Sequence, residues 1–313
     1  MKSFYHPYKS IFPLPHILGL SASPVMRSSP QSLSDIEETL DAICCTPKIH
    51  RADLRLRVKL PLLSIIYYTP ESNIIVTKTV ASLRKIVQSL NIFEDPYVLT
   101  LKRSDSEKSQ RELAKVLKSF KTYSQTQLKS IDKTSNEIIL VELGPWAADY
   151  YISTVVTRYL KAMSAKDTFI VEDSPAAEKL YIAKALRQVE ISPSTLSDTG
   201  KISNKVEKLL GIIAQQKPPF SAIIFVQERA TVSVLAHLLS HHPLTKDRFK
   251  IGTMVGTSLN GKRTDQIGEL VDVNQQKDTL SSFKRGKIDI LIATNVLEEG
   301  IDVPACNLVI CFR

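Results

Sequence analysis

The last 26 residues constrain the fold of this chain most strongly, because two short apolar runs flank a polar segment there. The runs cover residues 288–293 and 308–312, and each has the length of a strand that is buried on both faces. Ligands of open α/β sheets collect at the carboxyl ends of strands, so we expect a ligand site in the intervening loop. The polar residues of that loop are Thr294, Asn295, Glu298, Glu299, Gly300 and Asp302.

From Phe220 onward, predicted strands alternate with predicted helices. Apolar runs at residues 222–226 and 251–255 predict two more strands. Helical periodicity at residues 229–240 and 276–285 separates the strands from one another. Strands that alternate with helices of this length indicate a parallel sheet and an α/β fold. The sequence ends directly after a predicted strand, so we expect the chain to be a piece of a longer protein.

The middle of the chain has a helical pattern with almost no strand signal. Helices are expected at residues 82–90, 106–122, 146–163, 175–188 and 201–215. Before this block, residues 33–45 also have helical periodicity. A β-branched and aromatic run at residues 62–68 predicts a strand, and a short strand is expected at residues 17–20.

Basic residues are concentrated in one part of this helical middle. The whole chain has a formal net charge of +9, and residues 102–133 alone contain nine Lys or Arg against four Asp or Glu. Within this stretch Leu113, Val116, Leu117 and Phe120 are spaced as one apolar helical stripe. Another face of the same helix carries Arg111, Lys115 and Lys118. This basic face is either a solvated helix surface or a surface that contacts phosphates.

Composition excludes several classes of protein. The hydrophobic share of 43% is ordinary for a globular protein, and no apolar run approaches the ~20 residues that span a bilayer. We therefore expect no membrane partner and an intracellular location, cytoplasmic or nuclear. The cysteines have no zinc-ligand spacing, so we predict no metal site. They are Cys44, Cys45, Cys306 and Cys311.

One apparent phosphate-binding motif is rejected. Gly256, Gly261 and Lys262 follow a predicted strand with the spacing of a P-loop. The next residue is Arg263, although a Ser or Thr hydroxyl is needed there as a magnesium ligand. No Asp of the chain is followed by Glu, so the paired carboxylates of RNA-dependent ATPases are also missing.

Two motifs in a fixed order carry a resemblance to a known family. Residues 17–24, ILGLSASP, resemble motif III of superfamily 2 RNA helicases, and residues 292–304, IATNVLEEGIDVP, resemble motif V of the Dicer and RIG-I-like branch. Between them, residues 40–44, 142–151 and 228–232 are similar to the helicase region of fungal Dicer-like endoribonucleases, and more to the second of the two fungal types. The similarity covers nearly the whole chain.

The resemblance implies a division into three parts. Residues 1–68 would be the C-terminal tail of a first RecA-like helicase domain, which binds ATP. Residues 79–190 would be an all-helical insert that grips double-stranded RNA. Residues 200–313 would be most of the second RecA-like domain, truncated after motif V. The implied fold class is α/β, with RecA-like parallel sheets of which the first is only partial.

The resemblance also implies roles for individual residues. Ser21, Ala22 and Ser23 would couple the nucleotide state to the grip on RNA. Gly300 and Asp302 would face the nucleotide cleft. RNA contacts would come from the motif V loop, from the loop after residues 251–255 and from the basic helix; these residues are Thr294, Asn295, Gly256, Thr257, Arg111, Lys115 and Lys118.

The implied parent protein uses ATP and magnesium to engage or translocate on double-stranded RNA and cleaves it into small RNAs for RNA silencing and antiviral defence. This chain lacks the P-loop lysine, the magnesium carboxylates, the arginine motif and any ribonuclease III signature, so we expect it to bind no ATP or magnesium and to be inactive alone. Its partners would be the remaining helicase and ribonuclease III domains. Two alternatives stay open: a stand-alone, non-catalytic protein that binds RNA or a partner, and a piece of a RIG-I-like RNA sensor.

Overall fold

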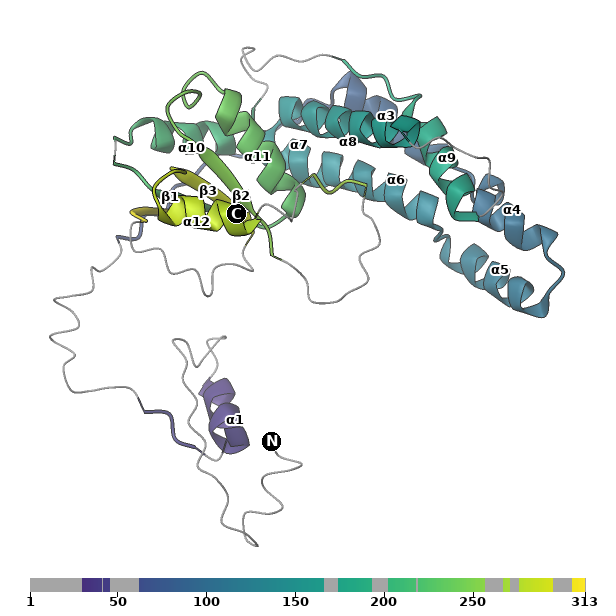
Figure 1. The fold of residues 1–313 in the computed structure, drawn as a ribbon, viewed down its shortest axis with the longest axis horizontal. Helices are drawn as coiled ribbons and strands as arrows, with labels where there is room; N and C mark the ends of the chain where they lie inside the picture. Colours follow the sequence, from purple (N-terminus) through teal and green to yellow (C-terminus); the bar gives the residue numbers. More distant parts are fainter. Residues whose placement is uncertain are drawn as a thin grey trace, which may run out of the picture. The chain divides into compact units, whose positions relative to one another are not determined.

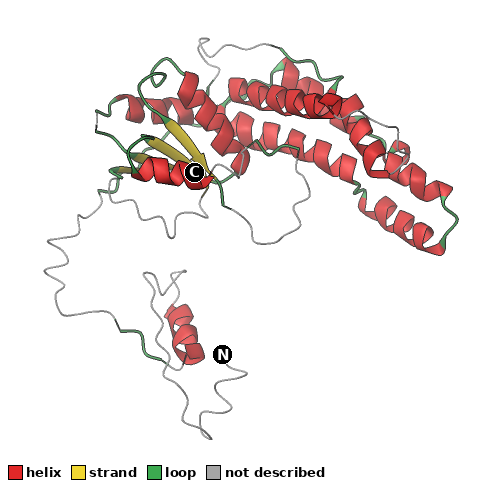
Figure 2. Ribbon diagram, viewed as in Figure 1, coloured by secondary structure: helices red, strands yellow, loops and turns green. Residues whose placement is uncertain are grey.

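The computed structural model describes residues 30–40, 42–45, 62–165, 174–192, 202–217, 219–256, 267–270, 276–294 and 306–312. The chain divides into two compact units, Met1–Ile66 and Tyr67–Arg313. Figure 1 labels the elements, and Figure 2 distinguishes the helices from the strands.

The described part of the first unit contains one helix, α1 (Pro30–Leu40). Just after it, the backbone N–H of Cys44 donates to the Glu37 carboxylate at 2.7 Å. The strand expected at residues 62–68 is wrong: this segment forms no strand, and Leu62 and Tyr67 are 96% and 83% exposed. A β-branched run becomes a strand only when a neighbouring strand pairs with its backbone, and none of the described residues does so here.

The second unit begins with a block of helices. Its elements are α3 (Lys78–Gln88), η2 (Ile92–Glu94), α4 (Pro96–Arg103), α5 (Glu107–Ser119), α6 (Tyr123–Lys133), the π-helical turn η3 (Thr134–Ile139), α7 (Leu140–Leu143), α8 (Pro145–Ala165) and α9 (Ser174–Leu186). Side-chain oxygens of Thr77, Asp95, Ser106 and Thr122 cap the N-termini of α3, α4, α5 and α6.

The basic helix is shorter than expected. α5 ends at Ser119, because Phe120 adopts a left-handed conformation with φ of 52°. The Phe120 ring is therefore 56% exposed instead of joining the stripe of Leu113, Val116 and Leu117, which packs against α4 and η2 residues. Figure 1 shows α4 and α5 at the end of the block that is far from the sheet.

A four-stranded parallel sheet forms the rest of the second unit. The strands are β1 (Ala222–Val226), β2 (Ile251–Met254), β3 (Ile290–Thr294) and β4 (Leu308–Cys311), in the order β2-β3-β1-β4. The accompanying helices are α10 (Asn204–Ala214), α11 (Arg229–His241) and α12 (Gln276–Lys284). These elements confirm the predicted α/β class with a parallel sheet.

The alternation of side chains along the strands divides the core into two layers. Ile223, Phe225 and Leu291 pack with Phe283 of α12 in one cluster. Ile224 and Ile292 belong to the larger cluster, which includes α11 and α8. Both faces of the sheet are thus covered, as a parallel sheet requires.

A glycine joins the helical block to α10. Gly144 has φ of +102°, and a Cβ there would lie 2.6 Å from the backbone nitrogen of Ser203. This close approach lets the Ser203 N–H donate to the Leu143 carbonyl at 3.1 Å, while the Ser203 hydroxyl donates to the Glu142 carbonyl at 2.6 Å. Only glycine combines this backbone conformation with the available space.

Candidate nucleic-acid interface

The carboxyl ends of three adjacent strands meet at one edge of the sheet. Thr294 ends β3, Gly256 lies just past β2, and Arg229 begins the helix that follows β1. The backbone N–H of Gly256 donates to the Thr294 hydroxyl oxygen at 3.0 Å, and Thr294 is 4% exposed. Two of the residues predicted to contact RNA, 38 positions apart in the sequence, are therefore in direct contact.

The direction of this hydrogen bond fixes what Thr294 can still do. A hydroxyl group has one proton to donate and two lone pairs that accept. Because the oxygen of Thr294 accepts from Gly256, its proton is left to donate, and none of the described residues is seen to accept it. A phosphate oxygen is a suitable acceptor for this proton.

Arg229 holds the other polar group of Gly256. Its Nη2 donates to the Gly256 carbonyl at 2.6 Å, and its Nη1 donates to Glu269 Oε1 at 2.9 Å. Sequence reasoning assigned no role to Arg229 or Glu269. The available signal was an arginine at the first position of a helix that directly follows a strand, because that position always lies at the carboxyl edge of a parallel sheet.

Several predicted site residues lie outside the described residues, so their roles stay predictions. They are Ser21, Ala22, Ser23, Thr257, Asn295, Gly300 and Asp302. The polar loop residues Glu298 and Glu299 and the short strand expected at residues 17–20 lie outside them as well.

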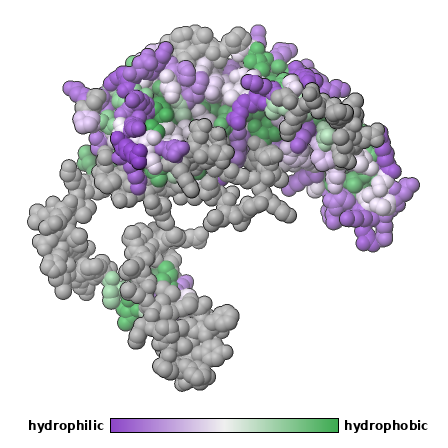
Figure 3. Space-filling view, viewed as in Figure 1, coloured by the Kyte–Doolittle hydropathy of each residue, from purple (hydrophilic) through white to green (hydrophobic). Residues whose placement is uncertain are grey.

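The basic face of α5 differs from the sheet edge, since two of its three cations are paired within their own helix. Arg111 pairs with Glu107, and Lys115 Nζ lies 3.4 Å from Glu112. The Arg111 and Lys115 side chains are 73% and 75% exposed, so water screens both pairs. Lys118 is exposed and forms no ion pair with a described residue. Figure 3 shows mostly hydrophilic colouring over this end of the block.

A buried polar cluster connects the α4–α5 pair to the rest of the helical block. The fully buried Asp95 carboxylate accepts from the Tyr97 N–H at 3.0 Å, from the Thr122 hydroxyl at 2.8 Å and from the Ser124 hydroxyl. Glu178 of α9 accepts from the Ser124 N–H at 3.3 Å, and burial raises the pKa of its carboxyl. These hydrogen bonds connect the start of α4 with α6 and α9.

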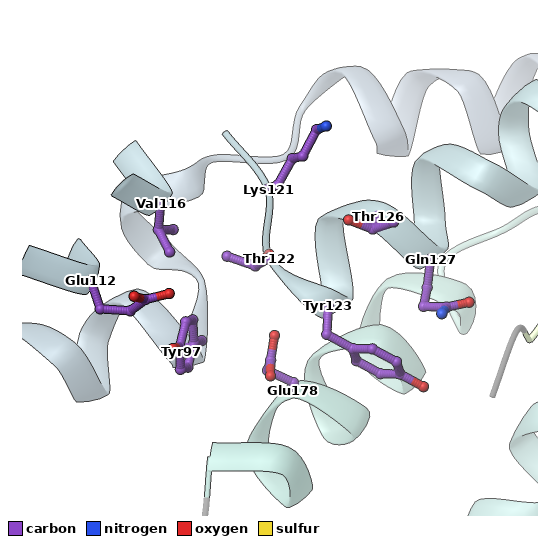
Figure 4. A pocket seen from close by; sticks show the side chains of 9 residues that line it. All are labelled: Tyr97, Glu112, Val116, Lys121, Thr122, Tyr123, Thr126, Gln127 and Glu178. Atoms are coloured by element: carbon purple, nitrogen blue, oxygen red, sulfur yellow. The ribbon is translucent and has the colours of Figure 1, made fainter. Parts of the chain in front are cut away.

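A cavity of about 370 Å³ opens beside this cluster (Figure 4). Its lining carries two carboxylates, Glu112 and Glu178, and one cation, Lys121. Burial raises the pKa of Tyr97, which also lines it. This balance of charge does not favour a phosphate, so the cavity is not assigned to RNA. The remaining lining residues are Val116, Thr122, Tyr123, Thr126 and Gln127.

Stacked rings join the helical block to the sheet. Trp146 and Tyr150 of α8 stack at 5.5 Å between ring centroids, and Tyr150 stacks on His237 of α11 at 3.9 Å. His241 also stacks on His237, at 3.9 Å between ring centroids. Burial, and then the neighbouring His241, lower the pKa of His237 to about 4, so the ring is neutral near pH 7. The neutral ring of His237 packs against α8 without a desolvated charge.

A second contact, between the helical block and the elements around the sheet, is a largely buried ion pair. Lys205 Nζ lies 3.8 Å from Glu142 and 4.2 Å from the centre of the Phe312 ring. Burial lowers the pKa of Lys205 and raises that of Glu142, and the attraction between them opposes both shifts. Lys205 is therefore committed to packing and is not available to a phosphate.

Among the described residues, no group of three or more His, Cys, Asp or Glu side chains could hold a metal ion. No described helix is both long enough and apolar enough to cross a membrane.

Comparison with known proteins adds to this geometry. Residues 204–313 match the helicase conserved C-terminal domain. The chain is 41% identical over 324 residues to Dicer-like protein 2-1 of Aspergillus niger and 40% identical over 318 residues to Dicer-like protein 2 of Cryphonectria parasitica. Both alignments cover 100% of this chain, which spans 23% and 22% of the length of these relatives.

A solved structure, the helicase domain of Pyrococcus furiosus Hef, aligns with 94% of this chain and 58% of its own chain. The TM-score of this alignment is 0.38, and the sequence identity is 20%.

Proposed function

We propose that this chain, which is similar over its whole length to part of the Dicer-like proteins, contacts the backbone of double-stranded RNA with the carboxyl edge of its sheet. The observation that carries the proposal is the Gly256–Thr294 contact, in which no described residue accepts the hydroxyl proton of Thr294, so that a phosphate could accept it. Duplex RNA is recognised mainly through phosphates and 2′-hydroxyls, so a site made of one hydroxyl and backbone groups suits it.

The helical block supplies a second contact in this proposal. The exposed cations of α5 add charge without base-reading groups, as expected for a surface that follows phosphates. In the proposed division, residues 79–190 are the insert that grips RNA, residues 200–313 are the second RecA-like domain, and residues 1–68 are the tail of the first.

ATP and magnesium enter only through the parent protein. We propose that Gly300 and Asp302 face the nucleotide cleft there, while Ser21, Ala22 and Ser23 couple the nucleotide state to RNA. Asn295 and Thr257 would extend the RNA contact on either side of Thr294 and Gly256. Phosphoryl transfer needs the P-loop lysine, the metal carboxylates and an arginine positioned together, and this sequence contains none of these motifs.

The parent function that fits the relatives is ATP-dependent engagement of double-stranded RNA and its cleavage into small RNAs for silencing and antiviral defence. The partners in this proposal are the RNA itself, the remaining helicase region and the ribonuclease III domains.

The test is binding of a short, blunt-ended duplex RNA to the 313-residue chain, followed by fluorescence anisotropy at several salt concentrations. We expect salt-sensitive binding that competing duplex RNA reduces more than duplex DNA does. A chain that binds neither duplex would refute the RNA contact. ATP turnover with duplex RNA well above a no-protein blank would refute its expected inactivity.

A further inference from the structure

Residues 267–270, which we call the strap, lie against the helical block. The N–H of Ile267 donates to Gln127 Oε1 of α6 at 3.0 Å. From α8, the Tyr151 hydroxyl donates to the Gly268 carbonyl at 3.3 Å, and Arg158 Nη1 donates to the Leu270 carbonyl at 3.0 Å. Three bonds from two helices thus fix the backbone of the strap.

The approach is close enough to require glycine at the centre of the strap. A Cβ on Gly268 would lie 2.4 Å from the Tyr151 hydroxyl oxygen. Tyr151 itself is 1% exposed, and its ring is held within the core of the helical block. The position of the strap is therefore set by a side chain that has little freedom to move.

The strap contacts the sheet edge through one side chain. Glu269 Oε1 accepts from Arg229 Nη1 at 2.9 Å, and the other arm of the same guanidinium donates to the Gly256 carbonyl at 2.6 Å. Gly256 in turn donates to Thr294. A continuous series of hydrogen bonds thus leads from α8 through the strap and Arg229 to the proposed phosphate contact.

We propose that Arg229 and Glu269 are positioning residues that hold the Gly256–Thr294 contact at a fixed place relative to the helical block. One RNA duplex can then contact both the sheet edge and the basic face of α5. The inference rests on the proposed function, since it names how the same edge is held for RNA. Arg229 suits this role because its planar guanidinium donates in two fixed directions at once.

We expect the protein to stay folded when the Arg229–Glu269 pair is broken, because the two side chains are 28% and 30% exposed and water can solvate the charge that remains. If breaking this pair changes RNA affinity, the cause is therefore a shift in the position of the Gly256–Thr294 contact.

The experiment compares E269Q with E228Q in the full chain, using duplex RNA binding at one salt concentration. Glu228 is exposed, precedes Arg229 and makes no capping bond, so E228Q removes the same charge without breaking the strap. Loss of a negative charge should by itself strengthen binding to RNA. We expect E228Q to bind as well as or better than the wild type, and E269Q to bind about 3- to 10-fold more weakly.

A second readout needs no RNA: amide hydrogen exchange of the free protein at Gly256, followed by NMR. We expect faster exchange at Gly256 in E269Q and, to a smaller extent, in Y151F, which removes one of the three bonds between the strap and the helical block, and unchanged exchange in E228Q. Unchanged exchange at Gly256 in both strap variants, or equal RNA affinities of E269Q and E228Q, would overturn the inference. If the wild type binds no duplex RNA, the proposed function fails, and the Gly256 exchange still decides the positioning role.

Discussion

The sheet edge and the basic helix α5 are both proposed to contact RNA, yet they are built in opposite ways. At the edge, the fold brings together residues at the carboxyl ends of three strands, and both the N–H and the carbonyl of Gly256 have a partner. On α5, the cations lie on a single exposed helix, and two of them pair with glutamates of that helix. The edge therefore offers a fixed geometry, whereas α5 offers adaptable charge.

The difference predicts which surface matters more for affinity. A preorganised donor loses little freedom on binding, while a long exposed side chain must give up rotamers and a local partner. We expect the edge to dominate affinity, and α5 to contribute mainly to the salt dependence.

The largest expected effect is at Thr294. T294V removes the hydroxyl and leaves the buried Gly256 N–H without an acceptor, which costs about 1–3 kcal/mol of unfolding free energy. We expect duplex RNA affinity to fall about 10-fold or more, because the phosphate donor is lost as well. T294S keeps the hydroxyl and is the control, with near wild-type affinity. Equal affinities of T294V and T294S would remove Thr294 from the interface.

A somewhat smaller effect is expected at the strap. G268A places a methyl group against the Tyr151 hydroxyl, and such overpacking costs about 1–3 kcal/mol in urea denaturation. RNA affinity should fall along with it, but less than in T294V. The matched control is G211A in α10, where a Cβ would meet nothing within 4 Å and where Ala stabilises a helix by roughly 0.5–1 kcal/mol. A G268A protein as stable as wild type would show that the strap does not need this close contact.

Stability should also depend on pH through the stack of Trp146, Tyr150, His237 and His241, which joins the helical block to the sheet. His237 has a folded pKa of about 4, below its ordinary 6.5, so between these values the unfolded chain binds more protons. The stabilisation is thus fully present above about pH 6.5 and is lost as the pH falls toward 4. His241 stacks on His237, so the effect is measured as a difference between two proteins that both keep His241.

The reference protein for this effect is H237F, which keeps a ring in the stack without a titrating group. Urea denaturation near pH 5 and near pH 7.5 should show the wild type losing about 1 kcal/mol more than H237F on acidification. The same loss in both proteins would mean that another group is responsible.

The smallest effect is expected on α5. K118A should weaken duplex RNA binding only about 2- to 4-fold and reduce the slope of log affinity against log salt by about one. E112Q, which frees Lys115 from its partner, should strengthen binding slightly. A loss in K118A as large as that in T294V would reverse the proposed ranking of the two surfaces.

The sequence predicted local structure well where periodicity decides it. β1 has the predicted bounds 222–226, and α11 and α12 lie within a residue or two of theirs. Contact between Gly256 and Thr294 follows from strand order, because β2 and β3 are neighbours and their carboxyl ends meet at one edge.

The sequence predicted less well where distant residues decide the structure. The left-handed Phe120, the unpaired segment 62–68 and the Glu269–Arg229 pair depend on neighbours that no local pattern shows. Arg229 and Glu269 are 40 residues apart, and the sequence around Gly268 has only a weak helical signal.

The most direct test is hydrogen exchange of the chain with and without a duplex RNA, read in peptides that contain Gly256, Thr294 or α5. If RNA contacts both the sheet edge and α5, amide exchange should slow at both in the same complex, with the larger change at the edge. Protection confined to α5, with Gly256 and Thr294 peptides unchanged, would contradict it.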